Sequence, residues 1–324
     1  MGGSFAAVVI MKFAFVFPGQ GSQSVGMMNG YKDLPVIQET FQEASDILKQ
    51  DFWAMVNSGS EEELNLTLNT QPLMLTAGVA VYRAWISLGG NKPALLAGHS
   101  LGEYTALVAS EALSFSDALS LVRFRAQAMQ KAVPEGVGGM AAILGLDDEI
   151  IKTICRDITN QGNGESLEPA NFNSPGQIVI AGHRNAILQG IELAKSKGAK
   201  RAIMLPMSIP SHCSLMKPAA ESMQLQLQHV TLQSPKIPIL HNTDVKPHSD
   251  PSVIKEILIR QLINPIHWVD TIRAFVAAEI THVIECGPGK VLTGLNKRID
   301  QHLQQLSLTD SETIKRAIND IRAI

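Results

Sequence analysis

The chain has 324 residues, of which 45% are hydrophobic and 18% charged, and its formal net charge is −3. A chain of this length predicts one large domain with an insertion, or two domains, and the composition is typical of a globular protein. The small net charge argues against nucleic acid or an anionic membrane as a partner, and no apolar run is long enough to span a bilayer.

Cysteine usage and the first residues bear on the cellular compartment. The three cysteines, Cys155, Cys213 and Cys286, are odd in number and lack metal-ligand spacing, which favours reduced thiols and no bound metal. The apolar start has neither a basic leading segment nor a small-residue cleavage site, so no secretory signal is predicted. We interpret Met11-Lys12 as the natural start, with residues 1–10 an added or misassigned extension, and we expect a cytoplasmic protein.

Short apolar runs alternate with amphipathic segments at the start of the chain. The pattern predicts a strand at 13–17, a loop at 18–23, a helix at 36–49, a helix at 72–88 with Thr70 or Gln71 before it, a strand at 94–97 and a helix at 103–109. Such alternation indicates a mostly parallel sheet covered by helices on both faces.

Residues 138–206 follow a different order. We predict a strand at 140–144, a helix at 147–158, strands at 169–173 and 177–182, a helix at 185–197 and a strand at 201–205. This βαββαβ order is the pattern of a ferredoxin-like unit. The sequence therefore predicts an α/β fold with two domains. A large α/β-hydrolase-like domain spans 1–137 and 207–324, with later strands at 237–240 and 282–286, and the small ferredoxin-like domain at 138–206 is inserted in it.

The segment Gly98-His99-Ser100-Leu101-Gly102 lies between a predicted strand and a predicted helix. In that setting Gly-x-Ser-x-Gly forms a nucleophile elbow, because glycine on both sides lets the serine adopt a strained turn with its hydroxyl exposed. The helix that follows directs its free amides, beginning with that of Leu101, at an oxyanion formed there. We interpret Ser100 as a nucleophile; the alternative is an ordinary Gly-rich loop.

A second informative residue is Arg125, on the helix predicted at 117–132, which Ser114 caps together with Asp117. It falls on the apolar stripe of that helix, and a buried arginine needs an anion because it stays protonated. That anion is either a protein carboxylate, in a structural ion pair, or a substrate carboxylate held by the arginine as a clamp. Arg123 lies off the stripe and is predicted to be solvated.

A serine nucleophile needs a base, and most of the nine histidines lie in incidental positions. His212 follows a predicted strand end, where ligand-facing loops lie in α/β domains, and precedes a helical pattern at 216–228 that disfavours imidazolium. It is either the catalytic base or a loop histidine.

No triad acid is evident: Asp244 and Asp270 follow His212, whereas hydrolases order serine, acid, histidine. Cys213 is interpreted as a spectator thiol because no basic cluster activates it.

Three further features have both an ordinary and a functional reading. The loop 18–23 is a generic Gly-rich turn, or supplies a second oxyanion amide from Gln20. Gly287-Pro288-Gly289-Lys290 lacks the full phosphate-loop spacing and predicts a strand-to-helix turn. The basic cluster Lys195, Lys197, Lys200 and Arg201 predicts a solvated helix end, or a docking site for an acidic protein.

Several motifs occur together in a fixed order. They are 17–23 (FPGQGSQ), 98–104 (GHSLGEY), Arg125, 171–177 (NFNSPGQ), 210–212 (PSH) and 287–289 (GPG). The ordered set closely resembles malonyl-CoA:acyl carrier protein transacylase of bacterial type II fatty acid synthesis, over residues 13 to about 298. We see no departure from that family at a site position.

The resemblance implies a function for each of these positions. Ser100 would be the nucleophile and His212 the general base of a Ser-His dyad, with Gln261 matching the position whose backbone carbonyl orients the histidine. Gln20 and Leu101 would be the oxyanion donors, with Gln20 also at the substrate, and Arg125 would clamp the malonyl carboxylate. The expected partners are malonyl-CoA and acyl carrier protein, which brings its own phosphopantetheine, and no other cofactor is expected. Neither nucleic acid nor membrane is expected as a partner, and the expected state is a monomer.

Three alternatives use the same residues differently. A serine esterase or thioesterase would transfer the acyl group to water and has no need for an arginine in the pocket. A stand-alone acyltransferase of polyketide synthesis would share all of the chemistry and differ only in its carrier. A non-catalytic docking protein would leave Ser100 unacylated.

Overall fold

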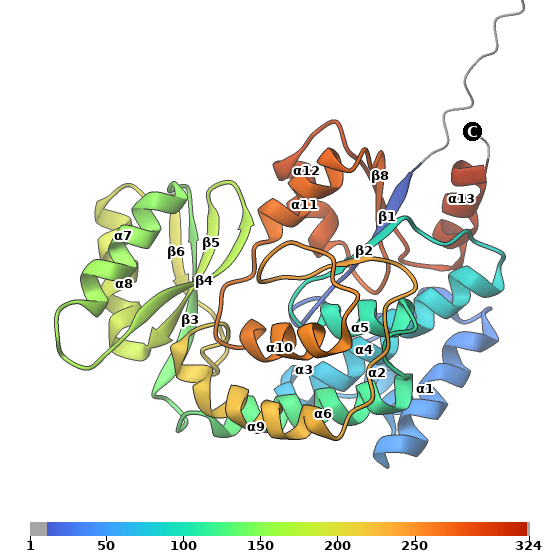
Figure 1. Ribbon diagram of the computed structural model, residues 1–324, viewed down its shortest axis with the longest axis horizontal. Coiled ribbons are helices and arrows are strands. Elements are labelled where there is room, and N and C mark those ends of the chain that lie inside the picture. Colours follow the sequence, from blue (N-terminus) through green and yellow to red (C-terminus); the bar gives the residue numbers. More distant parts are fainter. Residues whose placement is uncertain (1–11, 323–324) are drawn as a thin grey trace, which may run out of the picture.

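The computed structural model describes residues 12–322, and the expectation about a natural start at Met11 lies outside them. The chain forms two sheets that stand apart, each with its own helices (Figure 1). The smaller sheet lies at one end of the molecule and is built from the middle of the chain. The α/β fold class predicted from the sequence is confirmed by this pair of sheets.

The larger sheet is parallel and has five strands in the order β7-β2-β1-β8-β9. Its strands are β1 (Phe13–Phe17), β2 (Leu95–Gly98), β7 (Ile239–Leu240), β8 (His282–Glu285) and β9 (Gln304–Ser307). In the register of the first pair, Phe17 lies beside Gly98, so the loops after β1 and β2 leave the sheet at one edge. Ligand sites of parallel α/β sheets form at this carboxyl edge.

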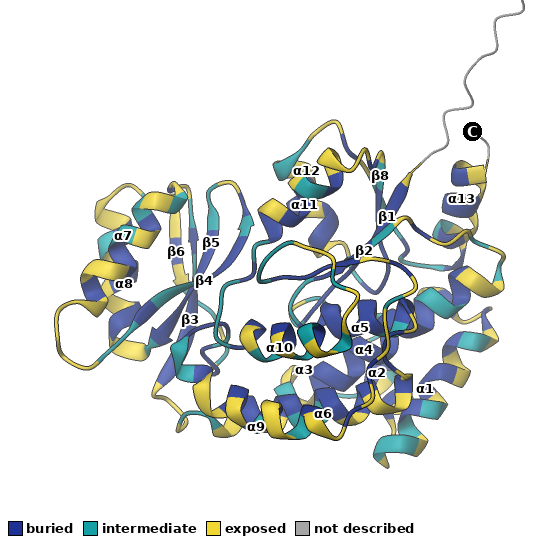
Figure 2. Ribbon diagram, viewed as in Figure 1, coloured by how far each residue is buried: buried dark blue, intermediate teal, exposed yellow. Residues whose placement is uncertain are grey.

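Helices cover both faces of the larger sheet, as the alternation of elements predicted. They are α1 (Pro35–Leu48), α2 (Phe52–Ser58), α3 (Glu61–Asn65), α4 (Thr67–Ser87), α5 (Gly102–Ala109), α6 (Phe115–Lys131), α9 (Lys217–Gln228), α10 (Pro251–Gln261), α11 (Trp268–Ala277), α12 (Val291–Ile299) and α13 (Ser311–Arg322). Strand β1 is buried on both sides: Phe13, Phe15 and Phe17 contact one apolar cluster, and Ala14 and Val16 contact the other. Figure 2 shows the buried residues gathered along the strands and on the inner sides of the helices.

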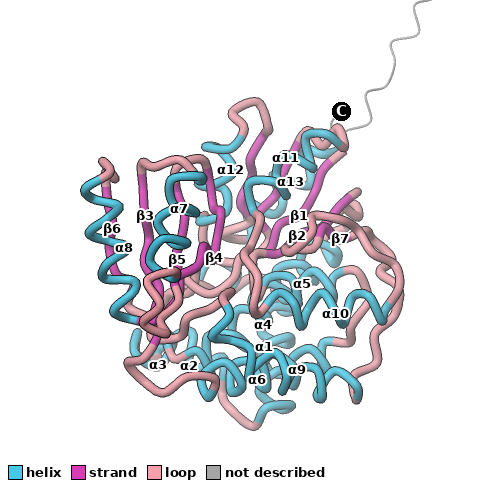
Figure 3. The backbone as a smooth tube through the Cα atoms, turned by 60° about the vertical axis from the view of Figure 1, so that its left-hand side comes forward, coloured by secondary structure: helices cyan, strands magenta, loops and turns pink. Residues whose placement is uncertain are grey.

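The smaller sheet is antiparallel, with the strand order β4-β5-β3-β6. Its elements are β3 (Gly138–Leu144), α7 (Asp148–Thr159), β4 (Leu167–Ser174), β5 (Gln177–His183), α8 (Arg184–Ser196) and β6 (Arg201–Met204). Both helices lie on one face of the sheet, where they share a separate apolar cluster (Figure 3). The order of elements is the βαββαβ order predicted from the sequence.

The two sheets are joined beside the carboxyl edge of the larger one. Phe172 donates its backbone N–H to Ile266 O, and Ile266 donates its own to Ala170 O, both at 2.9 Å. His99 Nε2, next to Ser100, lies 2.8 Å from Asn173 Oδ1 of β4. The two backbone bonds join the smaller sheet to the segment before α11, and the His99 contact joins it to the loop that carries the predicted nucleophile.

One predicted helix start is wrong. Helix α4 begins at Thr67 rather than at Pro72, and Leu66 rather than Thr70 or Gln71 is its N-cap. Asn69 and Thr70 close the extra turn by donating their backbone N–H groups to Leu66 O. Pro72 has no N–H, so it removes a single helical bond, the one to the carbonyl four residues earlier. The longer helix brings Gln71 into the active-site region.

The end of the chain was less predictable. Strand β9 and helix α13 have no counterpart among the sequence predictions, and both belong to the larger sheet and its cover. Strand β9 is polar for an element of a parallel sheet because it lies at the edge, beside β8. Within residues 12–322, no helix combines the length and apolarity required for crossing a membrane.

Candidate active site

The turn after β2 has the geometry of a nucleophile elbow. Ser100 has a φ of 52°, a left-handed conformation that is rare and strained for a non-glycine residue. A Cβ at Gly98 would lie 1.9 Å from the backbone of Gly102, and a Cβ at Gly102 would lie 2.1 Å from Phe17 O. Both positions therefore require glycine, which is the physical basis of the sequence pattern.

Ser100 and His212 are brought together from distant parts of the sequence. Ser100 Oγ lies 2.8 Å from His212 Nε2, and His212 Nδ1 lies 2.7 Å from the backbone oxygen of Gln261. Since a carbonyl only accepts, Nδ1 carries the ring proton and Nε2 is left to accept the serine proton. His212 also has a positive φ of 63°, so both members of the pair lie in strained backbone.

The imidazole of His212 is neutral in this setting. It is 3% exposed, and burial, followed by the nearby Arg125 cation, lowers its pKa from the ordinary 6.5 to about 3. From the sequence we expected the N-terminus of the following helix to keep the imidazole of His212 neutral. The structure attributes the lowered pKa to burial and to Arg125 instead.

The lowered pKa of His212 predicts an unusual pH dependence. A histidine with a depressed pKa stays deprotonated, and so remains able to accept the Ser100 proton, below the pH at which an ordinary histidine becomes protonated. We expect the rate of Ser100 acylation to change by less than about twofold between roughly pH 8 and pH 5. Rapid-quench measurement of acylation across this range checks it. A fall in the rate with a midpoint near pH 6.5 would show that the His212 pKa is not depressed in solution.

Arg125 lies buried beside this pair, with 1% of its surface exposed. Its Nη1 donates to Gln71 Oε1 at 2.8 Å, and its Nη2 donates to Gln261 Oε1 at 3.0 Å and to Ser100 Oγ at 3.3 Å. All three partners are neutral, and within residues 12–322 no carboxylate oxygen lies within 4.0 Å of the guanidinium. The structural ion pair considered from the sequence is therefore not formed, and a buried cation remains free to bind an acid group beside Ser100.

The predicted oxyanion donors lie close to the nucleophile. A Cβ on Gly19 would be 2.4 Å from His99 O and 3.6 Å from Leu101 N, so the loop after β1 lies against the elbow. Among the described residues, the backbone amides of Gln20 and Leu101 donate to no protein acceptor. Free N–H groups at this edge suit the binding of a negative oxygen. The side chain of Gln20 is held by Thr67 through an Nε2–Oγ1 contact of 3.3 Å.

A cavity of about 460 Å³ opens beside these residues. Its walls come from the loop containing Gln20, from the start of α4, from α6 and from the segment before His212, and they include Leu66, Gln130, Leu205 and Met207. The cavity is thus bounded by segments that also carry the predicted donor, cation and base, and its partly apolar walls suit a narrow, flexible chain.

Several other sequence interpretations can now be placed. Asp244 pairs with His248, and Asp270 lies near His267 and Arg273, so neither acts on His212. Burial raises the pKa of the Cys213 thiol to about 12, consistent with a spectator. The segment at 287–290 is the turn between β8 and α12.

The prediction for Arg123 is wrong. Its Nη2 donates to Gln50 Oε1, and its guanidinium lies 5.8 Å from the centre of the Phe52 ring. Partial burial lowers its pKa. The side chain packs between helices α6 and α2 rather than extending into solvent, because arginine can cover apolar surface with its stem while its head is bound.

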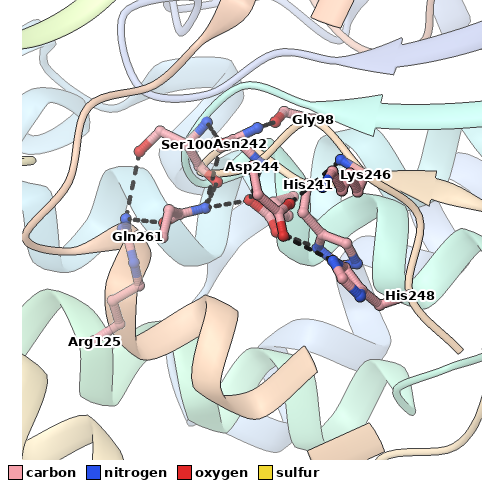
Figure 4. Close-up of polar contacts among 10 residues, drawn as sticks. Gly98, Ser100, Arg125, His241, Asn242, Asp244, Lys246, His248 and Gln261 are labelled. Carbon is pink, nitrogen blue, oxygen red and sulfur yellow. Dashed lines mark hydrogen bonds and ion pairs between the residues drawn. The ribbon is translucent and has the colours of Figure 1, made fainter. Parts of the chain in front are cut away.

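Four polar side chains hold the site without having been predicted in that role: those of Gln71, Glu103, Asn242 and Gln261. For Gln261 only the backbone oxygen was expected to take part. All four are at most 1% exposed. Asn242 accepts the Ser100 N–H at 2.8 Å and donates to Gly98 O at 2.7 Å (Figure 4). Burial of polar side chains is unusual, so a glutamate inside the apolar helix pattern at 103–109 was the available signal.

A strained serine, a neutral histidine that accepts its proton, free amides and a buried cation define a serine-dependent acyl-transfer enzyme. A family model described as "Acyl transferase domain" matches residues 14–315. The chain belongs to this acyl transferase family and, within it, to the malonyl CoA-acyl carrier protein transacylases.

Similar proteins cover nearly the whole chain. The malonyl CoA-acyl carrier protein transacylase of Salmonella typhimurium is 49% identical over 308 residues, which are 95% of this chain and 99% of that protein. The crystal structure of an acyl-carrier-protein S-malonyltransferase from Burkholderia pseudomallei is 54% identical, with a TM-score of 0.93, covering 95% of this chain and all of that one. A type II polyketide acyl carrier protein in complex with its malonyl-transacylase provides a third match, 45% identical with a TM-score of 0.93, covering 95% and 99%.

Proposed function

We propose that the protein moves a malonyl group from malonyl-CoA to the phosphopantetheine thiol of acyl carrier protein by way of an ester on Ser100. The observation that carries the proposal is Arg125, a buried cation whose contacts in the described chain are all neutral and whose Nη2 lies 3.3 Å from Ser100 Oγ. An acyl group that ends in a carboxylate supplies the negative partner for the Arg125 guanidinium, and it does so beside Ser100 Oγ.

In the first half-reaction His212 Nε2 takes the proton of Ser100, and Oγ forms a bond to the thioester carbon of malonyl-CoA. The carbonyl oxygen becomes an oxyanion beside the amides of Gln20 and Leu101. When this intermediate collapses, the carbon–sulfur bond breaks, and the imidazolium returns its proton to the CoA sulfur. Malonyl-serine and free CoA result.

The second half-reaction runs the same steps with a different thiol. The phosphopantetheine thiol gives its proton to His212 Nε2 and attacks the ester carbonyl of malonyl-serine. Collapse breaks the ester bond, and Ser100 Oγ recovers its proton from the histidine. The backbone oxygen of Gln261 holds Nδ1 in both halves, 2.7 Å away, so the ring keeps one orientation throughout.

The thiol acceptor separates this function from that of a thioesterase. We expect malonyl-CoA alone to give acylated protein and little hydrolysis, and addition of holo acyl carrier protein to give malonyl carrier at a rate at least about 10²-fold above hydrolysis. Release of CoA, followed in the presence of carrier and in its absence, measures both rates. Carrier lacking phosphopantetheine is the matched control. If malonate is released equally fast without carrier, the protein is a hydrolase.

A polyketide carrier is a second candidate acceptor. The complex noted above contains a polyketide carrier, and that transacylase is 45% identical to this chain, so similarity alone does not separate the two carriers. Assays that compare fatty-acid and polyketide carriers at equal concentration would decide between them. We also propose that the protein acts as a monomer, since one chain supplies the nucleophile, base, cation and amides of the site. The proposed location is the cytoplasm, which the three free, buried cysteines support.

A further inference from the structure

The backbone of Ser100 is held on both sides by two side chains. Asn242 Oδ1 accepts its N–H at 2.8 Å, and Gln261 Nε2 donates to its carbonyl oxygen at 3.0 Å. Figure 4 shows Gln261 between Arg125 on one side and the Ser100 turn on the other. The strained φ of Ser100 thus persists because its surroundings fix both of its peptide groups.

The carbonyl that Gln261 binds belongs to the peptide group between Ser100 and Leu101. The N–H of this same peptide group is that of Leu101, one of the two proposed oxyanion donors. The same oxygen also accepts the backbone N–H of Glu103 at 3.1 Å. Because a peptide group is planar, these two donors on its oxygen direct its N–H to the opposite side. A hydrogen bond to the oxygen also polarises the group and strengthens the N–H as a donor.

Gln261 and Asn242 are in turn attached to one carboxylate, that of Glu103. Glu103 Oε2 accepts from Gln261 Nε2 at 2.6 Å and from the backbone N–H of Asn242 at 3.3 Å, and the residue is 0% exposed. Its other oxygen, Oε1, lies 2.6 Å from Nδ1 of the buried His241. Glu103 lies on the first turn of α5, directly after the elbow, and its carboxylate is buried.

We propose that Glu103 is a positioning residue for the oxyanion site: through Gln261 and Asn242 it holds the Ser100–Leu101 peptide with the Leu101 N–H directed at the reacting carbonyl. The inference rests on the proposed function of Ser100 and Leu101. It assigns Glu103 no contact with substrate, so its loss acts on the transition state, in which the oxyanion forms, and not on the binding of malonyl-CoA.

The test compares Glu103→Met with Glu103→Gln. Methionine has a similar volume and no acceptor for Gln261, so we expect the acylation rate at saturating malonyl-CoA to fall by about 10- to 100-fold, with the half-saturating concentration within about threefold. Glutamine can keep an oxygen toward Gln261. Its NH₂ group can face His241, whose Nε2 has no hydrogen-bond partner among the described residues and which can change tautomer. Glu103→Gln should therefore stay within about threefold of the unsubstituted rate.

Glu285→Met is the matched control. Glu285 is also 0% exposed, and its carboxylate accepts the N–H groups of Leu292 and Thr293 at the start of α12. This variant loses a buried carboxylate without touching the elbow, so its melting temperature should fall while its acylation rate at saturation is retained. A loss of rate in both variants would show that general destabilisation, and not positioning, accounts for the effect of Glu103→Met.

Gln261→Met provides a second route if Glu103→Met does not fold. It keeps the backbone oxygen that binds His212, and it should lower the saturated acylation rate as Glu103→Met does, with a higher half-saturating concentration because Arg125 also loses a contact. In the double variant the loss of rate should be smaller than the product of the two single losses, because Glu103 acts on the Ser100–Leu101 peptide largely through Gln261.

The outcomes separate this inference from the proposed function. If the unsubstituted protein forms no malonyl-serine, the proposed function fails. If it does form the ester and either Glu103→Met or Gln261→Met retains the saturated acylation rate, or if their effects multiply in the double variant, the positioning role of Glu103 is refuted.

Discussion

Replacing Ser100 with alanine is expected to abolish malonyl transfer and the acylated form of the protein. His212 Nε2 then has no hydroxyl to deprotonate, and no other nucleophile is activated in its place, because burial keeps the neighbouring Cys213 thiol protonated. We expect the transfer rate to fall by at least about 10⁴-fold, as for other nucleophiles that work with a histidine. The intact mass after incubation with malonyl-CoA should show no gain of a malonyl group.

Ser110→Ala is the control for this variant. Ser110 is buried at the end of α5 that is farther from the elbow, where its Oγ donates to Leu107 O at 3.0 Å. The Ser110→Ala variant should be acylated on Ser100 at the rate of the unsubstituted protein. A malonyl adduct that persists in Ser100→Ala, mapped by peptide mass to Cys213 or to any other residue, would remove Ser100 from the mechanism and with it the proposed route.

The part of the site that sequence could predict is the part fixed by local backbone geometry. The two glycines around Ser100 are required by contacts within a few residues of the turn, and a contact of that kind leaves a pattern that can be read. Arg125 was singled out for a similar reason, because an arginine in an apolar helical stripe is visible without knowledge of the fold. The order of strands and helices likewise predicted both sheets.

The rest of the site depends on which distant segments of the chain meet in the fold. Gln261 at the end of α10, Asn242 after β7 and Glu103 on α5 contact one another only once the parallel sheet is formed, and no spacing in the sequence indicates it. The prediction for Arg123 was wrong for the same reason: its ring contact is with Phe52 of α2, and its hydrogen bond is with Gln50 in the connection between α1 and α2. The neutral state of His212 was expected from a helix N-terminus, but it follows chiefly from burial, which is a property of the whole fold.

The second large effect is expected for Arg125→Ala, which should lose malonyl transfer while it still accepts an acetyl group. A bidentate guanidinium–carboxylate contact in a buried site stabilises the bound acyl group by about 3 kcal/mol. We therefore expect kcat/KM for malonyl-CoA to fall by roughly 10²-fold. Acetyl has no carboxylate and gains nothing from the cation. Steady-state rates with malonyl-CoA and acetyl-CoA, expressed as a ratio, measure the change.

Arg123→Ala is the matched control, since it removes the same side chain two residues earlier on α6. Arg123 contacts Gln50 and Phe52 and has no bond to Ser100 or Gln261, so its loss should leave the malonyl-to-acetyl ratio unchanged even if stability falls. Arg125→Ala differs in removing the charge that lies beside Ser100 Oγ. If Arg125→Ala keeps its preference for malonyl, the carboxylate is bound elsewhere. If it loses malonyl and acetyl transfer equally, Arg125 supports the nucleophile and does not select the acyl group.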